Sequence, residues 1–219
     1  MLKKSILIIF LVLLVDQVVK IWIKTTMQLG EEYHIFGNWA IIHFTENNGM
    51  AFGMEFAGNY GKLFLSVFRI LAVAAIGWYL YSLTKKKESS FGLILSVSLI
   101  FAGAIGNIID SAFYGLLFSD SSFQVAEFMP DGGGYGTFLH GKVVDMLYFP
   151  IINGHFPQWV PFWGTEEFVF FRPVFNLSDT SITIGVIALI LFQKRFFKKE
   201  EEISKDEAAD ASETSTESD

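Results

Sequence analysis

The sequence predicts an all-α membrane protein with four transmembrane helices, a small extracytoplasmic β-sheet and an interfacial loop or helix. The mean hydropathy is +0.42 and 52% of the 219 residues are hydrophobic, which is too apolar for an ordinary soluble domain. Only 18% of the residues are charged, and they cluster between long apolar runs. We expect these runs to be spans at about 5–24, 62–83, 91–110 and 180–197.

Charge and cysteine content exclude several functional classes. The acid responsible for the net charge of −7 is concentrated after Lys199, so we expect no nucleic-acid partner. The absence of cysteine excludes disulfides, a thiolate nucleophile and cysteine-ligated zinc. The histidines lack metal-ligand spacing, which disfavours a zinc site.

The first apolar run is expected to remain in the membrane as a helix. Its basic start suits a secretory signal peptide, but the run is long, lacks a small-x-small cleavage site and contains Asp16 and Lys20. Ionisable residues inside a span are candidates for function. Since they are four residues apart, the two share a helix face. An ion pair with Lys20 reaching the interface is the plainer interpretation, and it is compatible with a functional role.

The loop at residues 25–61 is predicted to form short strands on the membrane surface. Ile35-Phe36 and the segment from Trp39 to Phe44 have strand composition, and Asn-Gly at 48–49 is a strong turn signal. The small residues and amides that follow Asn47 suit close approach by another backbone.

Small residues mark the end of the third span, from Gly103 to Asp110, and predict close helix packing there. Asn107 and Asp110 are three residues apart and share one helix face. Capping and turn formation explain the aspartate well and the asparagine less well.

The second long loop, 111–179, is aromatic and polar. Its stretch 156–163 is expected on the bilayer surface, because tryptophan and tyrosine favour the membrane–water boundary. After the fourth span and a basic stretch, the acidic, Ser/Thr-rich residues 200–219 are expected to be a disordered cytoplasmic tail.

The positions of lysine and arginine predict that both termini are cytoplasmic and that both long loops face outward. The basic residues on the inner side are Lys3, Lys4, Lys85, Lys86, Lys87, Lys194, Arg195, Lys198 and Lys199.

Two aspartates outside the predicted spans, Asp145 and Asp179, are candidates for a catalytic pair. Two acids held close together share one proton. The charged member accepts a proton from water, while the neutral member polarises the scissile carbonyl and later protonates the amine. Such a pair cuts a peptide bond without a cofactor or metal. Taken singly, Asp145 suits a solvated loop acid, and Asp179 suits an acid stabilised by a helix dipole.

Five short motifs, in order, resemble the lipoprotein signal peptidases, also called signal peptidase II. They cover the chain from about Asp16 to Phe192. The motifs are Asp16-Gln17-Val18-Val19-Lys20, Asn47-Asn48-Gly49-Met50-Ala51-Phe52, Gly103-Ala104-Ile105-Gly106-Asn107-Ile108-Ile109-Asp110, Val143-Val144-Asp145 and Phe175-Asn176-Leu177-Ser178-Asp179.

The resemblance implies a bacterial inner-membrane aspartic endopeptidase. Such an enzyme removes the signal peptide of diacylglyceryl-modified prolipoproteins just before the lipidated cysteine. It implies that Asp145 and Asp179 are catalytic, and we expect a monomer that contacts membrane lipid and needs no cofactor. The residues expected to bind substrate or support the site are Asp16, Lys20, Asn47, Gly49, Asn107, Asp110 and Asn176.

Two features depart from the family pattern. Members usually have arginine directly after the Asp of the third motif, where this chain has Ser111, and Lys142 or Arg172 is a hypothetical substitute. Residues 116–139 look like an insertion, for which a lid, a partner site and a lineage-specific addition remain open.

Other functional classes stay open at this point. A transporter or proton relay also places acids and amides in its spans, although no internal repeat or broken central helix is evident. A non-catalytic scaffold leaves the acids unexplained.

Overall fold

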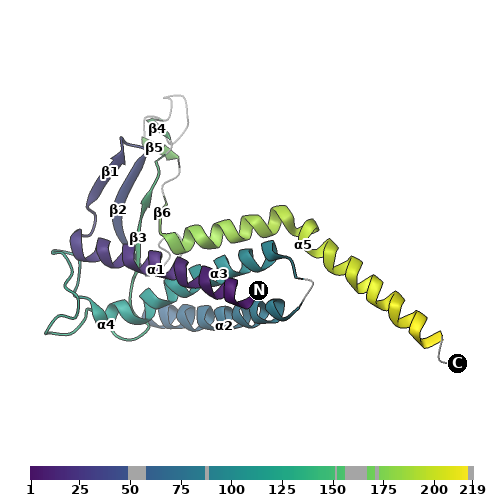
Figure 1. The fold of residues 1–219 in the computed structure, drawn as a ribbon. Helices are drawn as coiled ribbons and strands as arrows, with labels where there is room; N and C mark the ends of the chain where they lie inside the picture. The colour runs from purple at the N-terminus through teal and green to yellow at the C-terminus, as the bar shows by residue number, and fades with distance from the viewer. Residues whose placement is uncertain (49–57, 87–88, 151, 156–166, 171–172, 217–219) are drawn as a thin grey trace. The chain divides into compact units, whose positions relative to one another are not determined.

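The computed structural model describes residues 1–48, 58–86, 89–150, 152–155, 167–170 and 173–216 (Figure 1). The chain divides into two units, which we call the helical unit and the sheet unit. The helical unit consists of Met1–Leu14, Arg69–Ile105 and Ser178–Asp219, and the sheet unit of Val15–Phe68 and Gly106–Leu177.

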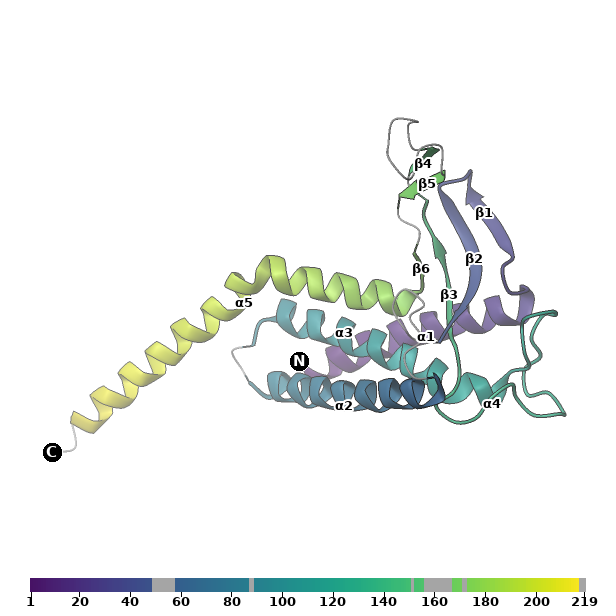
Figure 2. The ribbon, with the colours of Figure 1, turned by 180° about the vertical axis from the view of Figure 1, so that it is seen from behind.

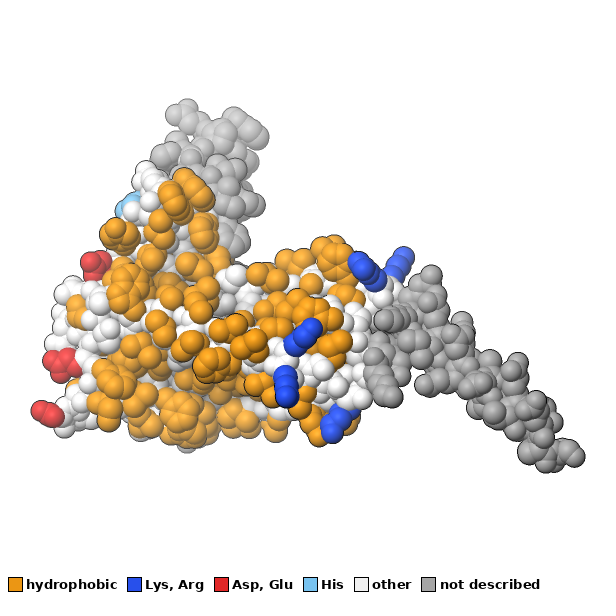
Figure 3. Space-filling view, in the orientation of Figure 1, with side chains coloured by type: hydrophobic (Ala, Val, Ile, Leu, Met, Phe, Trp, Pro, Cys, Tyr) orange, Lys and Arg blue, Asp and Glu red, His pale blue; other side chains and the backbone are white. Residues whose placement is uncertain are grey.

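Among the described residues, four helices are long and apolar enough to cross a membrane, as predicted. Their outward side chains are largely hydrophobic, as the space-filling view shows (orange in Figure 3), which is what lipid-facing helices require. The helices are α1 (Leu2–Thr26), α2 (Gly58–Lys85), α3 (Phe91–Ile109) and α5 (Leu177–Thr216).

Glycines hold α3 and α5 close together in the helical unit. A Cβ atom added to Gly103 would lie 2.2 Å from the carbonyl oxygen of Ser178, and one added to Gly185 would lie 2.6 Å from that of Ser96. Only glycine permits these contacts, so the close packing predicted for the end of α3 is confirmed.

Lysine and arginine side chains gather at one end of the helical unit (blue in Figure 3). Lys4, at the start of α1, lies 5.4 Å from the ring of Phe91, at the start of α3. The exposed Lys85, Lys194 and Arg195 lie at the ends of the membrane spans of α2 and α5. This distribution supports the predicted orientation, which remains a prediction.

The sheet unit is built on a four-stranded antiparallel sheet in the order β1-β2-β3-β6 (Figures 1 and 2). A separate antiparallel pair, β4 and β5, belongs to the same unit. The strands are β1 (Glu32–Phe36), β2 (Ala40–Asn47), β3 (Val143–Tyr148), β4 (Ile152–His155), β5 (Glu167–Phe170) and β6 (Val174–Phe175).

The structure confirms the two strands predicted from the sequence and adds β3 to β6, of which β3 carries Asp145. β3 is central, with Thr45 opposite Asp145 on one side and Phe175 opposite Leu147 on the other. Its first four residues are all buried, so the strand lacks the polar alternation that marks a half-exposed strand.

The helical path of α3 extends beyond the predicted span. A π-helical turn, η2 (Asp110–Tyr114), and the short α4 (Gly115–Leu117) continue it into the segment predicted as loop. Wide turns of this kind are common at functional sites. Tyr114 then joins Ile23, Phe44, Val144 and other residues in the apolar core of the sheet unit.

The C-terminal segment differs from its prediction. The structure continues α5 through the acidic residues to Thr216, where we expected disorder. This stretch is rich in glutamate, lysine and alanine, which are strong helix formers. The aromatic stretch 156–163 and Gly49 lie outside the described residues.

Candidate active site

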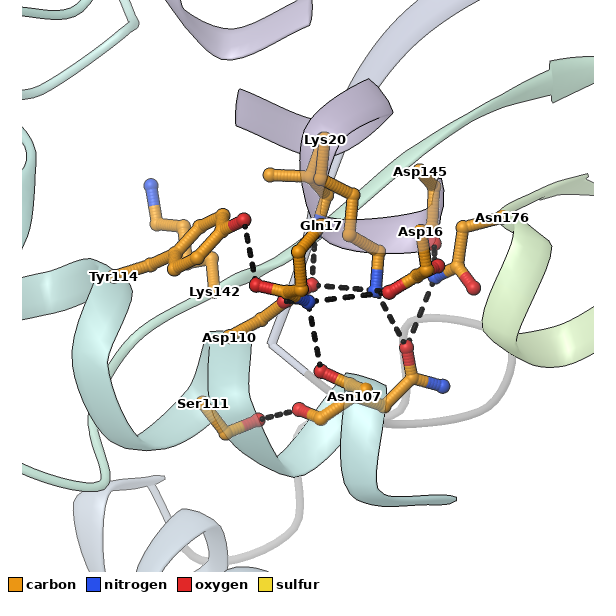
Figure 4. Close-up of polar contacts among 12 residues, drawn as sticks. Asp16, Gln17, Lys20, Asn107, Asp110, Ser111, Tyr114, Lys142, Asp145 and Asn176 are labelled. Atoms are coloured by element: carbon orange, nitrogen blue, oxygen red, sulfur yellow. Dashed lines mark hydrogen bonds and ion pairs between the residues drawn. The ribbon is translucent and has the colours of Figure 1, made fainter. Parts of the chain in front are cut away.

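Lys20 lies at the centre of the polar site in the sheet unit (Figure 4). Its side chain is fully buried, and its Nζ lies 2.9 Å from Asp16 Oδ2 and 2.8 Å from Asp110 Oδ2. Nζ also donates to Asn107 Oδ1 at 3.1 Å. An ammonium has three N–H donors, and these oxygens use all three. The charge of Lys20 is therefore balanced inside the protein, and its side chain does not reach the membrane–water interface.

Asp110 connects this site to β3. One carboxylate oxygen, Oδ2, accepts the backbone N–H of Val144 at 3.3 Å, directly before Asp145. The other, Oδ1, accepts the amide of Gln17 at 3.0 Å. Because Asp110 is fully buried, its bonds hold α1, η2 and β3 together at fixed positions.

Gln17 and Tyr114 are two site residues that our sequence reasoning missed. The Tyr114 hydroxyl donates to Gln17 Oε1 at 3.1 Å, so the Gln17 amide nitrogen turns to Asp110 and to Asp16, the latter at 3.1 Å (Figure 4). Gln17 stands within the first motif, which was the available signal. Tyr114 carried no such signal, because the π-helical turn that positions it is not evident from the sequence.

Asp145 is a buried acid, with 4% of its surface exposed, and this excludes the solvated-loop interpretation. The side-chain amide of Asn176 donates to Asp145 Oδ1 at 2.7 Å and to Asn107 Oδ1 at 3.1 Å. Asn176 itself is fully buried. The structure thus brings Asp16, Lys20, Asn107, Asp110, Asp145 and Asn176 into one connected cluster.

The other predicted site residues are placed separately. Asp179 is half-buried in the first turn of α5, where its charge also suits the helix dipole. Asn47 ends β2, opposite Val143 of β3. Ser111, in place of the family's usual arginine, donates its hydroxyl to the backbone oxygen of Asn107 at 3.0 Å.

A second buried lysine, Lys24, lies one helical turn beyond Lys20. It forms an ion pair with Glu46 and donates to the Ser121 hydroxyl at 2.8 Å. The rings of Tyr135, Phe118 and Phe44 surround its Nζ, with centroids at 5.0, 5.5 and 5.9 Å. Aromatic faces attract a cation, so the rings add to the stabilisation of this charge.

Lys142 completes this second cluster and bonds the other oxygen of Glu46 at 3.0 Å. Burial alone raises the pKa of Glu46, but the ammonium groups of Lys24 and Lys142 outweigh it and hold the pKa below its ordinary value. Lys142 was a hypothetical substitute for the missing arginine, and the structure pairs it with Glu46. Two sequence features could have indicated this cluster: the helical spacing of Lys20 and Lys24, and the position of Glu46 beside the second motif.

Comparison with known proteins identifies the family. The family model described as Signal peptidase (SPase) II matches residues 8–195. A lipoprotein signal peptidase of Porphyromonas gingivalis is 55% identical over 188 residues, which cover 86% of this chain and 81% of the relative. That of Amoebophilus asiaticus is 40% identical over 187 residues, which cover 84% and 75%.

Solved structures agree with this match. One bacterial membrane enzyme has a TM-score of 0.58 and 26% identity, with 88% of both chains covered. Another has a TM-score of 0.57 and 28% identity, with 86% of this chain and 91% of the other covered. The fold, the ordered motifs and these similarities lead to one conclusion: the chain belongs to the signal peptidase II family.

Proposed function

We propose that the chain is an aspartic endopeptidase that cuts diacylglyceryl-modified prolipoproteins just before the lipid-modified cysteine, with Asp145 and Asp179 as its catalytic pair. Membership of the family supports signal-peptide removal from prolipoproteins. The observation that carries the acid pair is the buried carboxylate of Asp145, held at 2.7 Å by Asn176, which precedes Asp179 by three residues.

Two contacts, one in each unit, support the pairing of these acids. In the sheet unit, Asn176 bonds both Asn107 and Asp145. In the helical unit, Gly103 allows the backbone of Ser178, the residue before Asp179, to touch α3. Gly103 and Asn107 are one turn apart on α3, so the same helix contacts the chain on both sides of Leu177.

The pair needs no group beyond a water molecule. One carboxylate takes a proton from the water molecule while the water oxygen bonds to the scissile carbonyl carbon. The other carboxyl donates its proton to the carbonyl oxygen, giving a neutral tetrahedral intermediate. When that intermediate collapses, the C–N bond breaks, the amine takes the proton that came from water, and the hydroxyl returns its proton to the second carboxylate.

The membrane setting supports a lipid-bearing substrate. The lipid-facing helices suit lateral entry of the signal helix, and the exposed hydrophobic side chains near the sheet suit the acyl chains. In this proposal the enzyme lies in the bacterial inner membrane, with both termini in the cytoplasm and the acids near the outer face, as the basic residues predict.

Asp145→Asn and Asp179→Asn test the acid pair. Cleavage of a synthetic diacylated prolipopeptide by purified enzyme in detergent is expected to fall at least about 100-fold in each variant. Asp131→Asn, which changes an exposed loop acid, is the matched control and is expected to leave the rate unchanged. Cleavage at the wild-type rate by either active-site variant would show that the pair is assigned wrongly.

A further inference from the structure

The hydrogen bonds that lead from Lys20 to Asp145 determine which atoms donate and which accept. Lys20 has only donors, so the Asn107 atom that it meets at 3.1 Å is the oxygen. An amide oxygen only accepts, so the Asn176 atom that meets it at 3.1 Å is the nitrogen. The orientation of both amides follows from the charge of Lys20.

The Asn176 nitrogen has a second N–H, and this one donates to Asp145 Oδ1 at 2.7 Å. Asp145 Oδ1 is therefore an acceptor and does not carry a proton. A short bond from a buried donor favours the charged form of a carboxylate over the neutral form. Lys20 thus fixes, through two amides, a donor aimed at Asp145.

We propose that Lys20, Asn107 and Asn176 form a positioning relay that makes Asp145 the ionised member of the catalytic pair. Asp179 then carries the shared proton. This inference rests on the proposed function and assigns the two roles within it. Asp145 takes the proton from water as the new C–O bond forms, and Asp179 donates to the scissile carbonyl oxygen. Asp145 later gives its proton to the departing amine as the C–N bond breaks.

The other charged groups near β3 leave this assignment intact. Asp16 and Asp110 are paired with Lys20. Glu46, on β2 opposite Val144, is paired with Lys24 and Lys142. A substitution at Asn176 leaves these ion pairs in place. The change that it causes in the pH profile therefore reports on Asp145.

The test is the pH dependence of kcat/KM for a synthetic diacylated prolipopeptide, compared between wild type and Asn176→Leu. The acidic limb reports protonation of the charged acid, and the basic limb reports loss of the shared proton. Leucine removes the donor at similar volume. We expect the acidic limb to move to higher pH by about one unit and the basic limb to move less. An acidic limb that does not move, or a basic limb that moves as far, overturns the relay.

Asn107→Leu is the second variant, and it decides the matter if Asn176→Leu has too little activity for a full profile. In this relay Asn107 acts on Asp145 through Asn176, and its loss removes the acceptor that orients the Asn176 amide. We expect a smaller shift of the acidic limb in the same direction. The double variant is expected to shift no further than Asn176→Leu alone, because the two residues act in series. Additive shifts would contradict the relay.

Thermal unfolding of each variant in the same detergent shows whether a shifted limb arises from a misfolded site.

The cleavage results also separate this inference from the proposed function. If Asp145→Asn and Asp179→Asn abolish cleavage but the Asn176→Leu profile matches wild type, the acid pair stands and the relay falls. If those aspartate variants still cleave, the proposed function itself falls.

Discussion

Lys20 and Lys24 lie one turn apart on the same face of α1, and both are fully buried, but they are neutralised in different ways. Lys20 is one ammonium between two carboxylates, Asp16 and Asp110. Around Lys24 the ratio is reversed, because Lys24 and Lys142 share the single carboxylate of Glu46. Aromatic rings complete the surroundings of Lys24, whereas an amide completes those of Lys20.

This difference distinguishes the site that we propose for catalysis from a cluster that holds packed elements together. The carboxylates and amides at Lys20 lead directly to Asp145 and to the backbone before it. Two of the rings at Lys24, Phe118 and Tyr135, come from residues 116–139, the segment that we expect to be an insertion, and Ser121 of the same segment bonds Lys24. This segment is therefore packed into the sheet unit at these residues.

Removing Lys20 is expected to have the largest effect. In Lys20→Met, the buried carboxylates of Asp16 and Asp110 lose the ammonium that they share, a change that costs about 3–5 kcal/mol in other buried pairs. We expect a marked loss of thermal stability in detergent and no measurable cleavage. Lys24→Met is the matched comparison on the same face. Equal destabilisation by both variants would contradict the distinction between the two sites.

The part of the site around Lys20 could be predicted because its members fall in short motifs and because Asp16 and Lys20 have helical spacing. The aromatic surroundings of Lys24 could not be predicted. Lys24 and Tyr135 are far apart in the sequence, and no periodicity within one sequence pairs them. β3 was missed for a related reason: its first residues are buried on both faces, so the alternation that reveals a strand is absent.

Removing Glu46 is expected to have the next largest effect. In Glu46→Gln, the buried Lys24 loses its carboxylate, although the aromatic rings remain, and we expect a loss of about 2–3 kcal/mol at pH 7. Because folding lowers the pKa of Glu46, its contribution is complete above the unfolded value of about 4.3 and is lost as pH falls through the folded value.

Unfolding measured as a function of pH checks this sign. The difference in stability between wild type and Glu46→Gln is expected to be constant above about pH 5 and to narrow below about pH 4.3. Glu32→Gln, an exposed acid paired with His43, is the control and is expected to change stability little at pH 7. A difference that widens toward acid pH would be incompatible with the ion cluster.

Lys24→Met is expected to have a smaller effect than the loss of either Lys20 or Glu46. Glu46 keeps its bond to Lys142, and a methionine side chain can occupy the space between the aromatic rings. We expect a loss of about 1–2 kcal/mol in unfolding measurements and near wild-type cleavage, because the relay to Asp145 is unchanged. Loss of cleavage without loss of stability would show that Lys24 takes part in the chemistry.

Tyr135→Phe is expected to have the smallest effect and tests the link between the insertion and β3. The Tyr135 hydroxyl accepts the backbone N–H of Lys142 at 2.7 Å, just before the strand begins. Phenylalanine keeps the ring beside Lys24 but leaves that N–H without its acceptor, for a loss of about 1 kcal/mol. Tyr33→Phe, at an exposed tyrosine of β1, is the control and is expected to have no effect. If Tyr135→Phe matches this control in both stability and cleavage, the hydroxyl contributes nothing to holding the segment 116–139 against β3. A loss as large as that of Glu46→Gln would instead make the hydroxyl, and not the ion cluster, the main attachment of the insertion.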